Sequence, residues 1–414
     1  MATYTDTIGV SGVHGTDLSG GDFATLALWQ STSATAMSNG DVLEAVILNG
    51  PPHYFHSTFP PWDSTTDFDI IVRGEDSHEG YWTSADRGTS AGASFTVTAN
   101  LSWYSFGDQN VNITFRDLIY SGTSTNRSMF FNQFNSTSGY SGQYQRTLTF
   151  ERCMFTHATN LTGVPNTFFT NYVGFESVDP STGEVSAIGK NTLNLINCVI
   201  EQGSYNPFVY FPTNPLQQCE IEINLIGVTH QQLTSGTIST VNAGIRMASQ
   251  IPDSAKDSIF RLNVSGTIWD QNLVRQSDFT NYFASATKYV NLYDSTINQS
   301  ETTVKNTFGE STPTCINPTY TSSNINYNTT YTYDGSAVDG TVSFVEDNQN
   351  SRERDYRQVE GSLGIDFVSN STMPSVDVAN TSRGTSPFTL GAYEFIAATT
   401  DVTIDFGNTY IRVY

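Results

Sequence analysis

A short pattern of alternating apolar and polar residues recurs along the chain, and it constrains the fold more than any other feature. In residues 192–200, Leu193 and Leu195 alternate with polar neighbours, Asn197 interrupts the alternation, and Ile200 ends the pattern. Each copy predicts two short strands joined by a bend. Because such a unit cannot bury its own apolar face, successive units are expected to stack into one elongated β-structure. The other copies are residues 112–120, 147–155, 220–228 and 289–297, with a shorter one at 261–268.

The repeats are unevenly spaced. A coil of a stacked β-structure takes roughly 20–25 residues, so the shorter gaps between repeats predict one coil with a modest loop. The longer gaps predict either one coil with a large insertion, such as 156–190, or two coils of which one is poorly patterned. From 300 to 345 the pattern weakens and predicts irregular coils. The apolar positions that we align are Phe115, Phe150, Leu195, Ile223, Val264 and Leu292, with gaps of 35, 45, 28, 41 and 28 residues.

The composition of the 414-residue chain favours strands and excludes several classes of partner. Aromatic residues make up 13% of the chain and charged residues only 14%, which favours strands and turns over helices and argues against disorder. A formal net charge of -22 predicts repulsion from phosphate backbones and anionic membranes, so neither nucleic acid nor membrane insertion is expected. No apolar run is long enough to span a bilayer, and the N-terminal sequence lacks the features of a secretory signal.

Two of the four cysteines fall at corresponding positions of two repeats. Cys153 and Cys198 each follow the residue that interrupts the alternation, on the inward side. Buried free thiols behave as small hydrophobes, so both are predicted to be core residues. The cysteines show no metal-type spacing, and no cofactor is expected.

The start of the repeat array carries its own signal. Asp22 is a suitable N-cap, and Phe23 and Leu26 can share one face of a helix over 23–31, ahead of a strand within 40–50. This arrangement resembles the opening of right-handed parallel β-helix proteins, in which a helix covers the first coil. The resemblance implies an all-β, single-stranded right-handed parallel β-helix with three parts: an N-terminal cap over 1–40, the β-helix over 41–395, and a C-terminal hairpin or attachment segment over 396–414.

The end of the array has a second marker. Residues 377–395 resemble the last coil of many parallel β-helix proteins, in which a segment of the D…R…GAYE type closes the array. Thr389 and Leu390 stand where that family often has Asp-Ile. After this marker, residues 401–406 and 410–414 alternate around Gly407 and Asn408 and form a candidate hairpin. The matching residues of the marker are Asp377, Arg383, Gly391, Ala392, Tyr393 and Glu394.

Carboxylates raise the alternative of an enzyme that cleaves polysaccharides, as many parallel β-helix proteins do. Glycoside hydrolysis uses two carboxylates about 5–10 Å apart, and stacked coils place equivalent positions about 4.8 Å apart. With 40 acidic residues in the chain, however, such pairs are expected by chance, and outward strand positions are predicted to be solvated. No catalytic residue is therefore assigned. The candidates are Asp117 with Glu151 and Arg152, Glu201 with Asp270 and Asp294, Glu220 with Glu222, and Asp67 with Asp69.

Histidines and tryptophans of the N-terminal third offer two further hypotheses. Three histidines in nearby loops could bind a metal, and three tryptophans could stack on sugars. No supporting spacing accompanies either set, so loop anchoring is the preferred interpretation and no metal site is assigned. These residues are His53, His56 and His78, and Trp62, Trp82 and Trp103.

The composition and architecture resemble those of tailed-bacteriophage fibres, spikes and head-decorating proteins. The resemblance implies a structural virion protein whose partners are other capsid or tail proteins, with a host surface glycan as a further contact and a homotrimer as an expected assembly. The alternative is a polysaccharide lyase or glycoside hydrolase of the tailspike depolymerase type. Charge concentrates in residues 346–357, which predicts either a solvated loop or a partner interface. The candidate interface residues are Arg352, Arg354 and Arg357, together with Tyr410, Arg412 and Tyr414 in the C-terminal segment.

Overall fold

The computed structural model describes the strands of the repeat array and much of the chain that follows it. The described residues are 3–8, 23, 26, 29, 38–48, 53–55, 68–75, 94–97, 102–104, 111–122, 128–133, 145–157, 167–172, 176–178, 185–202, 209–211, 219–232, 244–247, 259–270, 272–274, 287–308, 319–332, 338–347, 354–368, 373–384, 387–395, 402–405 and 410–413.

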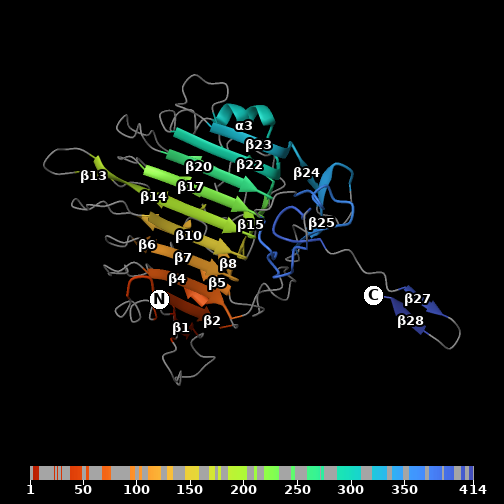
Figure 1. The fold of residues 1–414 in the computed structure, drawn as a ribbon, viewed down its shortest axis with the longest axis horizontal. Coiled ribbons are helices and arrows are strands. Elements are labelled where there is room, and N and C mark those ends of the chain that lie inside the picture. The colour runs from red at the N-terminus through yellow and green to blue at the C-terminus, as the bar shows by residue number, and fades with distance from the viewer. Residues whose placement is uncertain are drawn as a thin grey trace.

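The chain is mostly β and is built around one large parallel sheet (Figure 1). Each repeat contributes one strand to a first row, and every strand pairs in parallel with the corresponding strand of the next repeat. This arrangement is consistent with an all-β parallel β-helix. In order, the row contains β1 (Thr3–Ile8), β2 (Val42–Ile47), β4 (Phe68–Gly74), β7 (Val111–Arg116), β10 (Gln145–Glu151), β14 (Val185–Ile196), β17 (Cys219–Ile226), β20 (Ile259–Ser265), β22 (Thr287–Ile297) and β23 (Thr319–Tyr327).

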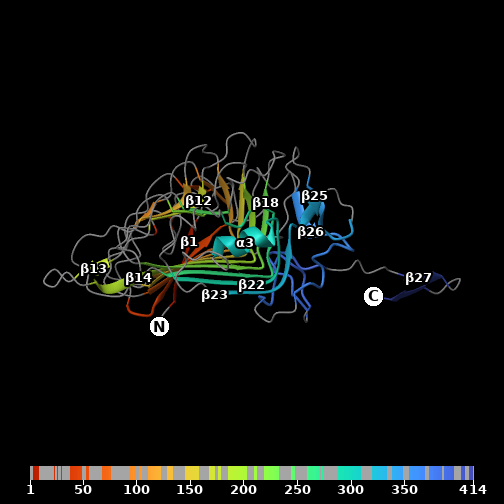
Figure 2. The ribbon, with the colours of Figure 1, turned by 90° about the horizontal axis from the view of Figure 1, so that it is seen from above.

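Two further rows of parallel strands run beside the first. The second row begins just after the bend of each coil and ends in the last residues of β22 and β23; the third forms a separate sheet. Figure 2 shows the rows on different sides of the stack. The second row contains β3 (His53–Phe55), β5 (Ser94–Val97), β8 (Ile119–Gly122), β11 (Met154–His157), β15 (Val199–Gln202), β18 (Thr229–Gln232) and β21 (Ile268–Trp269). The third contains β6 (Ser102–Tyr104), β9 (Ser128–Gln133), β12 (Thr167–Tyr172), β16 (Val209–Phe211) and β19 (Ile245–Met247).

The remaining elements lie outside these rows. β13 (Glu176–Val178) pairs antiparallel with the first part of β14, within the insertion expected over 156–190. β24 (Thr330–Thr332), β25 (Thr341–Asp347) and β26 (Arg354–Gln358) form a small sheet. Near the C-terminus, β27 (Val402–Asp405) and β28 (Tyr410–Val413) pair antiparallel.

In the coils from β7 to β23, whose bends are described, one residue makes the bend between the first and second rows, and it has a positive φ. Glycine, asparagine and aspartate adopt this conformation at the lowest cost, which explains why a polar residue or glycine interrupts each repeat. The next residue points inward: Cys153 and Cys198 are both buried free thiols, which confirms the core prediction. The bend residues are Asp117 (φ 56), Arg152 (φ 51), Asn197 (φ 51), Gly227 (φ 61), Gly266 (φ 60), Asp294 (φ 42) and Asn324 (φ 54).

The observed register corrects the predicted alignment of Ile223. It also decides whether the long intervals between repeats hold one coil or two. Leu195 pairs with Leu225, which in turn pairs with Val264, so the alignment of Ile223 with Leu195 and with Val264 was wrong by two residues. A shift of two keeps every side chain on the same face, so the apolar pattern could not detect it. Because β10 pairs directly with β7 and with β14, and β17 pairs directly with β20, each of the three longest intervals holds one coil with an insertion.

Buried side chains lie at both ends of the stack. Near the N-terminal end, Leu26 and Trp29 have helical backbone, and both are buried against the main core. Near the other end, helix α3 (Glu301–Phe308) lies close to β23 and buries Val304 in the same core (Figure 1). The prediction of irregular structure over 300–345 was therefore wrong for this segment. The Ser300 hydroxyl, which accepts a hydrogen bond from the Thr303 N–H (3.1 Å), is a helix N-cap signal that the prediction overlooked.

The GAYE segment does not continue the stack as its last coil. It packs instead on the outer side of coils in the middle of the array: the Gly391 N–H donates to the Gly266 carbonyl (2.7 Å), and the Ala392 N–H donates to Thr229 Oγ1 (2.8 Å). A second apolar core forms between this segment and outward side chains of the second row. That core contains Ile119, Met154, Val199 and Ile268 from the coils, and Phe344, Tyr356, Met373 and Leu390 from the C-terminal part.

Candidate functional site

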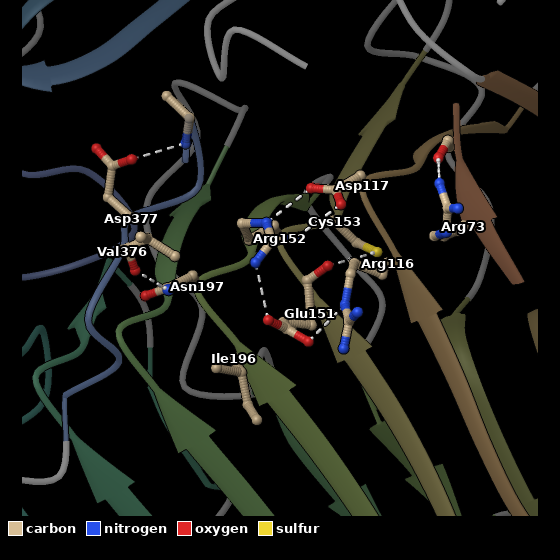
Figure 3. A network of polar contacts seen from close by, with 12 residues as sticks. Arg73, Arg116, Asp117, Glu151, Arg152, Cys153, Ile196, Asn197, Val376 and Asp377 are labelled. Carbon is tan, nitrogen blue, oxygen red and sulfur yellow. Dashed lines mark hydrogen bonds and ion pairs between the residues drawn. The ribbon is translucent and has the colours of Figure 1, made fainter. Parts of the chain in front are cut away.

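The first group of candidate carboxylates forms an ion-pair network at the bends of two neighbouring coils (Figure 3). Arg152 donates to both oxygens of Asp117 at 2.7 and 2.8 Å and to Glu151 at 2.8 Å. Arg116 donates to the other oxygen of Glu151 at 2.8 Å. The hydrogen bonds to Asp117 raise the pKa of the Arg152 guanidinium. Two carboxylates held by two guanidiniums favour a role in joining the coils over proton transfer.

The second carboxylate pair also joins neighbouring coils. Glu220 and Glu222 extend from β17 toward Lys190 of β14, whose Nζ lies 3.5 Å from Glu220 and 2.6 Å from Glu222. The hydrogen bond to Glu222 raises the pKa of the Lys190 ammonium. From the other side, Arg261 of β20 donates to Glu220 at 2.8 Å and stacks over the ring of Tyr289. The charges of three strands therefore compensate one another.

The remaining candidates have individual partners and do not converge on one place. Asp69 accepts a hydrogen bond from Asn112, and Asp294 accepts one from Asn324. In each case the asparagine belongs to the next coil. Asp270 accepts from Asn298 (3.1 Å). Glu201 is fully buried beneath the C-terminal part and accepts a 2.8 Å hydrogen bond from the Tyr356 hydroxyl. Asp67 lies outside the described residues.

Most of the predicted loop candidates lie outside the described part of the chain. His53 falls in β3 and Trp103 in β6, while His56, His78, Trp62 and Trp82 are not described. Within the described ranges, no cluster of histidine, cysteine, aspartate and glutamate could hold a metal ion.

Sequence reasoning missed a row of asparagines on the outward face of the first row of strands. Asn224 donates a hydrogen bond to Asn194, Asn263 to Asn224, and Asn291 to Asn263, each with a length of 2.7 Å. The row continues to Thr149, which accepts from Asn194 at 3.0 Å. The signal was present in the repeats, because an asparagine recurs three residues before the bend residue in four successive first-row strands.

Sequence reasoning also missed the buried centre that holds the C-terminal part against the coils. The side chain of Arg383 is fully buried and donates to Glu394 (3.0 Å), to the Gly391 carbonyl (2.8 Å) and to Asn197 Oδ1 (3.2 Å). Asp377 accepts a 3.0 Å hydrogen bond from the backbone N–H of Glu394. The residues of the D…R…GAYE marker thus tie their own segment together and fasten it to the coil bends at Asn197 and Gly266.

Replacing Gly391 with alanine is expected to destabilise the protein by about 2–4 kcal/mol. Gly391 has a φ of 81°, and an added Cβ would clash with Thr229 Oγ1 and lie 2.8 Å from Ile268 Cδ1. Denaturant unfolding provides the measurement. Gly384→Ala is the matched control, because an added Cβ at Gly384 meets nothing within 4 Å. Equal stability of the two variants would contradict the close packing inferred here.

The predicted interface residues fall on two separate elements. Arg354 and Arg357 belong to β26, where Arg357 is exposed, and Tyr410 and Arg412 belong to β28. Arg352 and Tyr414 lie outside the described residues. The structure thus places Arg354 and Arg357 together on one strand.

An exposed apolar side chain lies beside Arg357. Val345 of β25 is 36% exposed and falls at a bulge between two paired positions, opposite Tyr356 and Arg357. Because Phe344 and Tyr356 point into the second core, Val345 and Arg357 share the outer face of this sheet. Val338, in the turn before β25, is 44% exposed. Among the described residues, the large hydrophobic side chains that are exposed are these two valines and Tyr4 of β1.

Comparisons with known proteins do not place the chain in a family. No protein-family model matches it, and searches of curated proteins and of solved structures found no match. Among the helices of the described residues, none has the length and apolar character needed to cross a membrane.

Proposed function

We propose that this chain is a structural protein of a bacteriophage virion, a head-decoration or tail fibre/spike type component that makes protein contacts on the particle surface. In this proposal the chain is a right-handed parallel β-helix with an N-terminal helical cap and a C-terminal hairpin. The proposal is supported by the joining of successive coils through ion pairs and side-chain amides, which makes a rigid support. The described candidate carboxylates contribute to that support or to the C-terminal contacts.

The observation that carries the proposal is the outer face of the β25–β26 sheet. Exposed Val345 lies beside exposed Arg357 on a sheet whose inner face is anchored by Phe344 and Tyr356, and exposed Val338 lies in the turn before β25. Arginine next to exposed apolar side chains is typical of interface centres. We assign this face to another capsid or tail protein, with the C-terminal segment at Tyr410 and Arg412 as a second contact. A homotrimer and contact with a host surface glycan belong to the same proposal.

This proposal is tested by quantitative mass spectrometry of phage particles. The particles are purified from a lysate in which the gene for this chain is expressed. We expect the chain in a fixed ratio to the major capsid or tail protein. The double variant Val345→Glu, Arg357→Glu should be lost from the particles because it places charge in the contact. Tyr4→Glu, which changes the third exposed hydrophobic side chain, should be retained.

Two results would overturn the proposal. The first is absence of the unmodified chain from purified particles. The second is release of reducing or unsaturated sugars from a host polysaccharide by the purified chain, which would favour the alternative of a depolymerase.

A further inference from the structure

The outward side chains of the first row of strands form a surface that we term the ladder face. It comprises the outward residues of β2, β4, β7, β10, β14, β17, β20 and β22, with the asparagine row near its centre. Its four cations remain 30–36% exposed, yet each is paired with a glutamate of a neighbouring coil. These cations are Arg73, Arg116, Lys190 and Arg261.

The ladder face is nearly neutral on a strongly acidic chain. Its acidic members are Glu44, Asp69, Glu151, Glu220 and Glu222, so its net charge is 4 minus 5, or -1. The rest of the chain holds 14 basic and 35 acidic residues, a net charge of -21. Two copies of the chain repel each other least where these faces meet. Because each of the four cations is already paired with a glutamate and Asp69 accepts a hydrogen bond from Asn112, burying the face leaves no charged group without a hydrogen-bond partner.

Other surfaces of the stack are already occupied by the chain itself. Trp29 and Val304 are buried near the two ends of the stack, which disfavours addition of a second stack end to end. The outward side of the second row is covered by the C-terminal part, shown in blue beyond β18 in Figure 2. The first row of strands, including β14, β22 and β23, runs along a different side. Of the two sides formed by the first and second rows, the ladder face is the one that the C-terminal part leaves accessible to solvent.

The size of the ladder face suits a stable contact between two copies. From β4 to β22 the row has seven strands, which at about 4.8 Å per spacing extend roughly 29 Å. The segment from Lys190 to the bend at Asn197 extends roughly 23 Å at about 3.3 Å per residue. Two such faces bury roughly 1,300 Å², within the range of about 1,200–2,000 Å² for specific interfaces.

We infer that two copies of this chain associate through the ladder face, with the asparagine row of one copy against that of the other. Each amide donates one N–H to the preceding coil, and Asn224 and Asn263 direct a second N–H to Glu222 at 3.3 and 3.5 Å. The second N–H of Asn194 and of Asn291, and one oxygen lone pair of every amide, are left for a partner. An amide row can therefore both donate to and accept from a matching row, as a self-complementary twofold contact requires. This inference does not depend on the virion proposal, which concerns the β25–β26 sheet, and the twofold contact through the ladder face is separate from the homotrimer of that proposal.

Light scattering and sedimentation of the full chain, across a wide range of protein concentration, test the inference. We expect a mass above the 45.4 kDa of one chain, rising from low salt to near-seawater salt because salt screens the repulsion between acidic surfaces. Asn291→Arg introduces a charge at the end of the amide row and should weaken association at least about tenfold. Thr192→Arg should act in the same way from a position beside the row. Val345→Arg, on the other surface, should leave association unchanged.

Each outcome decides the inference. Loss of association in Asn291→Arg and Thr192→Arg, with native circular dichroism and an unchanged mass for Val345→Arg, supports it. If Asn291→Arg does not fold, Thr192→Arg decides. A mass of 45.4 kDa for the unmodified chain under all conditions overturns it, as does an oligomer that neither variant weakens. A monomer that binds host polysaccharide, and loses that binding in Asn291→Arg, would assign the face to a glycan and also overturn it.

Discussion

Replacing Arg383 with alanine is expected to lower the free energy of unfolding by about 3–5 kcal/mol, the largest effect of any single change considered. The guanidinium is fully buried, and its removal leaves Glu394 without its cation and the Gly391 carbonyl without its 2.8 Å donor. Burial lowers the pKa of Arg383, and the neighbouring Glu394 and Asp377 oppose that shift. Lysine offers a point charge without the guanidinium fork, so Arg383→Lys should recover only part of the loss.

Denaturant unfolding measures the loss, and dye binding to exposed apolar surface shows where it occurs. Detachment of the C-terminal part would uncover Met154, Val199 and Ile268 of the second core. Lys305→Ala is the matched control: it removes a cation from an exposed 3.1 Å pair with Glu301 on helix α3 and should change stability by about 0.5 kcal/mol or less. A loss below about 1 kcal/mol for Arg383→Ala would show that this centre does not hold the segment.

His230 is expected to make the protein sensitive to mild acid. The ring is buried inside the coil stack, where it pairs in register with Ile200 and stacks on Trp269 with ring centres 4.1 Å apart. Burial lowers the pKa of His230 to about 3. Below pH 6.5 the unfolded chain therefore binds a proton that the folded chain does not. The stability contributed by the neutral ring is complete above that pH and is lost as the pH falls toward 3.

The size of this effect is about 2 kcal/mol between pH 7 and pH 5. We expect the free energy of unfolding of the unmodified chain to fall by that amount relative to His230→Phe, measured by denaturant unfolding at both pH values. Phenylalanine can stack on Trp269 and does not titrate. The other five histidines are common to both chains, so their contributions cancel in the comparison. Identical pH profiles would show that the pKa of His230 is not lowered in the folded chain.

The candidate site was only partly predictable. The sequence placed Asp117, Glu151 and Arg152 at neighbouring positions, and they do meet across two coils. Which role they take depends on partners, and Arg116 reaches Glu151 only because β7 and β10 are in register. The asparagine row could have been found by aligning the repeats at their bends. Val345 could not, because its exposure depends on which face of β25 the coils cover.

What the sequence determined by itself is the stack and its inside. Alternation with a period of two marks the inward side of each strand, and the residue that interrupts it marks the bend, so Cys153 and Cys198 were predicted as core from pattern alone. The same period leaves the register open by two residues, which is why Ile223 was aligned with Leu195. Only the tertiary structure decided that the bend residues line up and that Asn197 meets Val376 and Arg383, which follow it by 179 and 186 residues. That contact requires the coils to be stacked first, because its partners come together only on the finished outer side of the stack.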